Sequence, residues 1–170
     1  MKLKRIAAVV IGVLAVAAAQ GAPPKLTDIP PLIKQLKAAD AKERVTALQE
    51  LSKIAQVKVS FTKVAIPGVI ESLKDADGGV RREAAITLSY LQADPKVAVP
   101  PLHEALKDKD GNIRRAVADT LAEFGGEAKE ALPTLLEIQK ELAALPKEDQ
   151  QKIGDLIQSI NRAVGAIRGQ

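Results

Sequence analysis

The sequence has no cysteine, a single histidine and only three aromatic residues among 170 positions. Without thiols it has no disulfides, zinc–thiolate sites, thiol nucleophile or lipid on an N-terminal cysteine. The aromatic residues are Phe61, Tyr90 and Phe124, so Ala, Leu, Val and Ile supply nearly all of the apolar side chains. A single deep core usually contains more large rings. Small aliphatic residues instead indicate helices that pack closely in thin layers.

Motifs for catalysis are equally scarce. In the stretch PPLHEAL, Leu102, Ala105 and Leu106 form the apolar stripe, so His103 is predicted to point outward into solvent. No serine stands in a nucleophile-elbow context, and both Gly-Gly pairs are typical of helix ends rather than of a phosphate-binding loop. We therefore expect no enzymatic activity and no cofactor.

Residues 1–19 are predicted to be a secretory signal peptide. Basic MKLKR precedes an apolar run of 14 residues, from 6 to 19. This run is shorter than the roughly 20 residues of a membrane-spanning helix. Ala17 and Ala19 suit cleavage before Gln20, and Ala19 and Gly21 suit cleavage before Ala22. We expect an exported protein, periplasmic or extracellular; an uncleaved membrane anchor is the alternative.

Cleavage changes the charge of the chain. The signal contains three basic residues and no acidic ones, so 25 basic residues fall to 22 against 21 acidic ones, a net charge of +1. Binding to nucleic acid requires a basic face that releases counterions from phosphates. A nearly neutral exported chain therefore predicts no nucleic-acid partner.

Long-range repetition is the main feature after a proline-rich lead at 20–28. Four similar blocks start at Ile29, Ile66, Val99 and Leu132, at spacings of 37, 33 and 33 residues. Each block begins with an apolar residue followed by a proline. Apolar residues then recur at intervals of three and four residues, which predicts helices. In the first three blocks a second helical pattern follows.

These blocks predict an all-α fold, an α-solenoid of about four helical hairpins. The repeat domain is predicted at 29–170, with units near 29–65, 66–98, 99–131 and a divergent capping unit at 132–168. Pro67, Pro100 and Pro133 are expected in or near the first helical turns; in a helix that begins earlier they would cause a kink. From Pro146 the chain predicts one long amphipathic capping helix.

Two similar decapeptides, DADGGVRREA and DKDGNIRRAV, occur 33 residues apart. They begin like calcium loops, but both lack the glycine at position 6 and the first lacks the closing carboxylate, so no metal site is expected. A turn between two helices explains them better. Asp77 and Asp110 are predicted to cap the second helices, and Arg81 and Arg114 follow at the same offset.

The Ile/Val-Pro-x-Leu/Val starts and Asp-x-x-Val/Ile-Arg turns resemble HEAT repeats, specifically short bacterial HEAT-like units also found in phycobilin lyase subunits. The resemblance covers residues 29–139 and is strongest in units two and three. Unit one has Glu43 where Val80 and Ile113 stand, and unit four lacks the turn. The resemblance implies a superhelix in which the turn arginines and aspartates form a ladder between units. It specifies a fold class, not a function.

Second helices of such hairpins commonly line the concave side. Their outward positions supply the candidate protein-binding residues, because arginine and tyrosine are favoured interface anchors and the mixed charge suits a protein or peptide. In the alternative interpretation, Ile86 and Tyr90 pack against the neighbouring helix. The candidates are Arg82, Arg115, Ile86, Tyr90, Asp119 and Glu123.

The predicted function is a non-enzymatic scaffold of the cell envelope or exterior that binds an unknown protein or peptide on its concave face. Lyase-like or chaperone-like handling of a small molecule is a second hypothesis, implied only by the resemblance to lyase subunits. A structural spacer is a third. Two exposed ends would allow an end-to-end homodimer, and membrane contact is expected only through an uncleaved signal.

Overall fold

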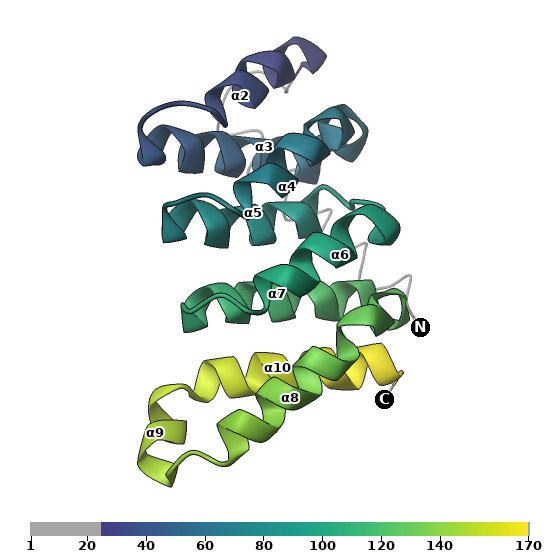
Figure 1. The fold of residues 1–170 in the computed structure, drawn as a ribbon. Coiled ribbons are helices and arrows are strands. Elements are labelled where there is room, and N and C mark those ends of the chain that lie inside the picture. The colour runs from purple at the N-terminus through teal and green to yellow at the C-terminus, as the bar shows by residue number, and fades with distance from the viewer. Residues whose placement is uncertain (1–24, 170) are drawn as a thin grey trace.

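The computed structural model describes residues 25–169, so the predicted signal peptide lies outside the described residues. Within this range every regular element is helical. The helices form two layers, and Figure 1 shows one layer crossing in front of the other. The front layer, called the A helices, contains α2 (Ile29–Gln35), α4 (Ile66–Ser72), α6 (Pro95–Ala105) and α8 (Leu132–Ala143).

The second layer, called the B helices, follows the A helices alternately along the chain. Its members pack side by side in sequence order. They are α3 (Ala41–Thr62), α5 (Gly78–Tyr90), α7 (Gly111–Phe124) and α10 (Gly154–Arg168). Four further helical segments are short. η1 (Leu26–Asp28) precedes α2, η2 (Lys63–Ala65) and η3 (Gly125–Ala131) join successive units, and α9 (Lys147–Lys152) connects α8 to α10.

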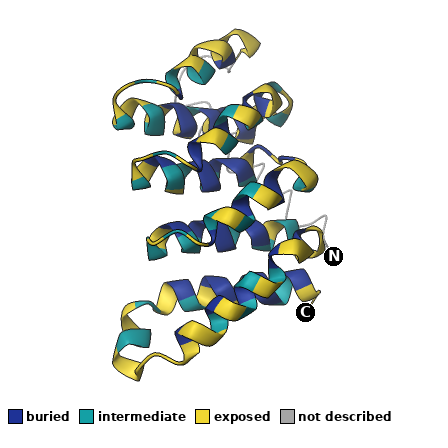
Figure 2. Cartoon of the chain, in the orientation of Figure 1, coloured by how far each residue is buried: buried dark blue, intermediate teal, exposed yellow. Residues whose placement is uncertain are grey.

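The core lies between the two layers and is almost entirely aliphatic. Figure 2 shows buried positions running along the B helices where the A helices cover them. Leu48, Leu88, Leu121 and Ile160, one from each B helix, are all completely buried. Side chains of this size let the layers approach closely, as the shortage of aromatic residues predicts.

Aspartates define where the B helices begin. The side-chain oxygen of Asp77 accepts from Val80 N–H at 3.0 Å, and that of Asp110 accepts from Asn112 N–H at 2.8 Å. Asp40 caps α3 in the same way. Each cap satisfies one of the N–H groups that a helix start leaves unpaired.

A different pair of aspartates joins successive units. Arg44 Nε and Nη2 each donate to Asp75, both at 2.7 Å. Arg81 binds Asp108 in the same way: its Nε donates to Oδ2 at 2.6 Å and its Nη2 donates to Oδ1 at 3.3 Å. The side chains of both pairs are 11–15% exposed. Arg81 Nη1 also donates to the carbonyls of Asp75 and Ala76, in the turn between α4 and α5. The aspartates of the ladder are therefore not the capping aspartates.

The arginines lower the pKa of both ladder aspartates. The hydrogen bond from Arg81 holds the pKa of Asp108 below its ordinary value, against the opposing effect of burial. Burial is the largest influence on Asp75 and raises its pKa, but hydrogen bonds from Arg44 and a backbone N–H, with the arginine charges, lower it overall. Both carboxylates are thus stabilised in their ionised form.

Arg114 does not continue this ladder, contrary to the sequence-based prediction. Its Nε is buried without a hydrogen-bond partner in the described part of the chain. Glu141 stands where Asp75 and Asp108 stand in their units, and it is exposed on α8. Because α8 runs on to Ala143 and no tight Asp-x-Asp turn follows, the last junction lacks a suitably placed carboxylate.

One helix boundary follows the alternative of an earlier helix start, and another differs from the prediction. Asp94 caps α6 and Pro95 occupies its first position, so Pro100 lies inside the helix rather than in its first turn. The proline cannot donate to the carbonyl four residues earlier. The long capping helix is broken at Ile153, where φ is −118° and ψ is 23°, giving α9 and α10. The break lets α10 pack on α7 as a B helix.

Buried hydroxyls connect neighbouring B helices, a feature that the sequence patterns did not reveal. Thr120 Oγ1 lies 2.9 Å from the carbonyl oxygen of Ala85, and Ser52 Oγ lies 3.1 Å from Thr87 Oγ1. All three hydroxyl residues are buried. Thr87 and Thr120 occupy equivalent positions of α5 and α7, and together with Ser52 they help to set the stacking of α3, α5 and α7.

Candidate functional site

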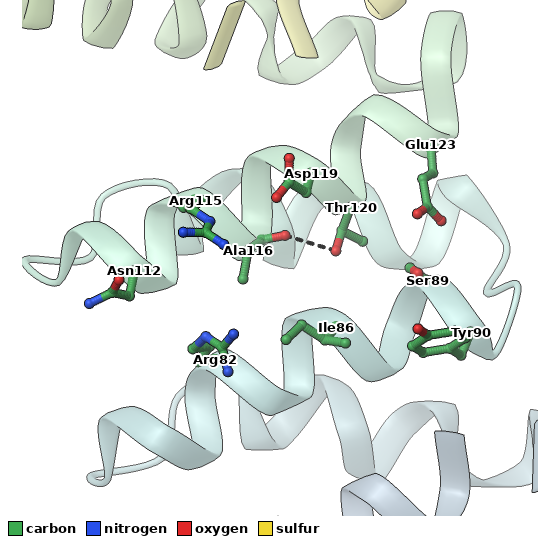
Figure 3. A pocket seen from close by; sticks show the side chains of 10 residues that line it. All are labelled: Arg82, Ile86, Ser89, Tyr90, Asn112, Arg115, Ala116, Asp119, Thr120 and Glu123. Carbon is green, nitrogen blue, oxygen red and sulfur yellow. Dashed lines mark hydrogen bonds between the residues drawn. The ribbon is translucent and has the colours of Figure 1, made fainter. Parts of the chain in front are cut away.

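All six candidate binding residues line one groove between α5 and α7. Figure 3 shows the three from α5 facing the three from α7 across it. The groove has a volume of about 180 Å³ and lies on the outer side of the B helices, here called the B-helix face. Its lining consists of Arg82, Ile86, Ser89 and Tyr90 from α5 and Asn112, Arg115, Ala116, Asp119, Thr120 and Glu123 from α7.

The apolar members of the groove differ in accessibility. Ile86 is half-buried and packs against the core, which agrees with the alternative interpretation for this residue. Tyr90 is 43% exposed. The α5 side of the groove therefore presents an accessible aromatic ring beside the outer edge of a partly buried isoleucine.

Two of the charged residues in the groove are bound to α10. Arg115 Nη1 lies 2.8 Å from Asp155 Oδ2, and Asp119 Oδ1 lies 2.9 Å from Arg162 Nη1. Neither pair was predicted from the sequence, because the C-terminal segment was interpreted as a cap outside the repeat register. The available signal for these pairs was the spacing of Asp155 and Arg162, which lie seven residues apart and therefore on the same face of a helix.

A second cavity of about 570 Å³ adjoins the arginine end of the groove. It lies between the start of α7 and the α9–α10 junction. Asn112 and Arg115 line both cavities. Sites for small molecules usually have this size but are lined mainly by apolar side chains. This lining is largely polar, with Gln151, Lys152, Asp155, Ile153 and Leu156 among its residues.

The prediction that His103 points outward into solvent is wrong. Its Nε2 lies 2.8 Å from Thr134 Oγ1, its Nδ1 lies 3.8 Å from Glu130 Oε1, and its side chain is 21% exposed. The residue lies on α6, against which η3 of the following unit packs. This packing, which the isolated apolar stripe could not reveal, covers the side of the helix that carries His103.

Residues 25–169 contain no cluster of three or more acidic or histidine side chains arranged to hold a metal ion. In the same range, no helix combines the length and apolar character needed to cross a membrane.

Comparison with known families identifies the repeats. A family model described as HEAT repeats matches residues 66–145. Residues 66–145 carry HEAT repeats, and the helical array that contains them is here called the HEAT array. The HEAT array is thus an all-α solenoid, and the resemblance predicted from the proline starts and aspartate–arginine turns is confirmed.

The HEAT array is similar to a solved structure of the complex of CpcE and CpcF of phycocyanin lyase from Nostoc sp. PCC7120. Identity is 26% and the TM-score is 0.62, over 87% of this chain. The array spans only 55% of the length of that lyase chain. An engineered protein is similar in fold, with 21% identity and a TM-score of 0.55, over 84% of this chain and 67% of its own. Curated proteins provide no match to the sequence.

Proposed function

We propose that the HEAT array is a non-enzymatic scaffold that binds a protein or peptide through the groove on its B-helix face. The observation that carries the proposal is this groove, where the exposed residues Arg82 and Tyr90 lie about two turns apart on one helix. Tyrosine and arginine are the side chains that most often anchor protein interfaces. Because both side chains stand on one helix, binding does not have to order the backbone that carries them.

The dimensions of the groove favour a polypeptide over an enclosed small ligand. About 180 Å³ is below the usual size of a small-molecule pocket, but it accommodates side chains that project from a chain lying across the surface. The lyase structure that the array resembles is described as a complex of CpcE and CpcF, so that related solenoid assembles with another protein. This similarity supports a protein partner.

Capture experiments can test the binding face. We expect the immobilised wild-type array to retain a partner from an envelope extract, and the Arg82→Glu/Tyr90→Ala variant to lose it. The control Lys107→Glu/Val97→Ala makes the same kinds of change at exposed positions of α6 and its C-terminal turn, in the A layer. Equal capture by all three proteins would contradict the proposed face, and no specific capture by any would favour a structural spacer.

The second candidate function is lyase-like or chaperone-like handling of a small molecule. Similarity to a phycocyanin lyase complex and the cavity of about 570 Å³ support it. An absorbance spectrum of the array purified from its native source distinguishes the two functions, since a retained chromophore would absorb visible light. A featureless spectrum together with partner capture would favour the scaffold.

We further propose that the scaffold acts outside the cytoplasm. The basic and apolar composition of residues 1–19 supports export. Mass spectrometry of the mature protein should give an N-terminus at Gln20 or Ala22. An intact Met1 in the envelope fraction would instead indicate an uncleaved anchor.

A further inference from the structure

The groove carries unequal charge at its two ends. Figure 3 shows Arg82, Arg115 and Asn112 at one end, Tyr90 and Glu123 at the other, and Ile86 between them. Arg115 is paired with Asp155, whereas neither Arg82 nor Glu123 has an ion-pair partner within the range 25–169. A ligand therefore meets a free cation at one end of the groove and a free anion at the other.

The arginine end suits a carboxylate. Arg115 already binds one, because Asp155 reaches it from α10. The Asp155 side chain is 78% exposed, and an ion pair this open to water is easily exchanged. A carboxylate from a ligand could thus take the place of Asp155 on Arg115 while also contacting Arg82, which is unpaired.

The opposite end suits a cation. Tyr90 presents an exposed ring and Glu123 an exposed carboxylate, and both line the same groove. A lysine or arginine side chain placed there gains an ion pair with Glu123 and a cation–π contact with Tyr90. Ile86 and Ala116 supply the apolar part of the centre of the groove, which Asp119, paired with Arg162, also lines.

The length of the groove sets the spacing of the ligand residues. Eight residues separate Arg82 from Tyr90 along α5, which corresponds to about 12 Å at about 1.5 Å per residue. An extended chain covers this length in about four residues at about 3.3 Å each. Alternate side chains of an extended chain face the same way, so the first, third and fifth residues would meet the arginine end, Ile86 and the Tyr90–Glu123 end.

We propose that the groove binds an extended segment of a partner protein with the pattern acidic–x–apolar–x–basic, an inference that rests on the proposed binding function. An extended chain fits better than a helix, because a helix about 10 Å wide cannot enter a groove of about 180 Å³. The unpaired charges of Arg82 and Glu123 select the acidic and basic residues at the two ends of the segment, and Ile86 selects the apolar residue in its middle.

Three capped, fluorescently labelled peptides test the pattern by polarisation: Asp-Ala-Leu-Ala-Lys, Asp-Ala-Leu-Ala-Asp and Lys-Ala-Leu-Ala-Lys, each with the same Gly-Ser flanks. The wild-type array should bind the first about tenfold more tightly than the other two. Glu123→Lys should shift the preference to the double-Asp peptide, and Arg82→Glu to the double-Lys peptide. Asp155→Asn should strengthen binding of the first peptide by freeing Arg115.

The control Glu104→Lys reverses the charge of an exposed residue on α6, in the A layer, and should change none of these affinities. Equal binding of the three peptides, no binding of any, or unchanged preferences in the variants would overturn the pattern. Tighter binding of a peptide with its acidic, apolar and basic residues at helical spacing of four would overturn the extended conformation. If the pattern fails but Arg82→Glu/Tyr90→Ala still abolishes partner capture, the proposed function stands without it.

Discussion

Substitution of two adjacent arginines on α5 should have very different effects on stability. Arg81→Ala removes two hydrogen bonds to Asp108 and two to the carbonyls of Asp75 and Ala76. Arg82→Ala removes a side chain that is exposed and has no hydrogen bond in the described range. The two substitutions delete the same atoms from neighbouring positions, so they separate the structural role of the turn from its surface chemistry.

The expected loss of stability depends on how far the arginine–aspartate ladder is buried. A hydrogen bond that involves a charged group contributes about 1.5–3 kcal/mol when buried. The Arg81 and Asp108 side chains are 15% and 11% exposed, so water partly compensates the lost partners. We expect Arg81→Ala to lower the free energy of unfolding by about 2–3 kcal/mol, and Arg82→Ala to change it by no more than about 0.5 kcal/mol. The corresponding change in Tm for Arg81→Ala is about 4–12 °C.

Urea and thermal unfolding followed by circular dichroism measure both effects. A double-mutant cycle with Asp108→Ala should then yield a coupling energy of about 1 kcal/mol or more between Arg81 and Asp108. Equal losses of stability in Arg81→Ala and Arg82→Ala, or an absent coupling, would refute the ladder as a source of stability between units.

Two other predictions concern acid stability and a glycine. The pKa values of Asp75 and Asp108 are lowered on folding, so their stabilising effect is complete above the ordinary aspartate pKa of 3.8 and is lost as the pH falls below it. An Asp75→Asn/Asp108→Asn variant should therefore lose less stability than wild type between pH 5 and pH 2, as urea titrations would show; parallel losses would contradict this. Gly125 has a φ of +54°, which disfavours any side chain, so Gly125→Ala should cost about 1–2 kcal/mol. Gly126→Ala, where a Cβ meets only the end of Lys129, is the control, and equal effects would argue against strain.

Local signals in the sequence predicted the start of the B helices well. An N-cap depends on one aspartate and the two or three residues that follow it, so Asp77 and Asp110 could be assigned from a decapeptide. The outward-facing residues of the B helices could also be predicted from the sequence, because repeats in register place equivalent residues side by side. For this reason the six candidates lie around one groove.

Features that depend on contact between distant segments could not be predicted in this way. His103 and Arg114 each have surroundings that are decided by the following unit. The break at Ile153 depends on the packing of α10 against α7, which favours a helix restarted in the repeat register over one continuous cap. A one-dimensional pattern describes the faces of a helix but does not specify what covers them.

The last junction of the array differs physically from the two before it. The partly buried pairs Arg44–Asp75 and Arg81–Asp108 join the first three units, but Arg114 has no such partner. Two exposed ion pairs on the B-helix face, from Arg115 and Asp119 to α10, replace it there. Exposed pairs contribute little, so apolar packing of α10 on α7 must hold this end. The exposed pairs can therefore exchange partners at small cost to the fold, which is the property that a binding surface requires.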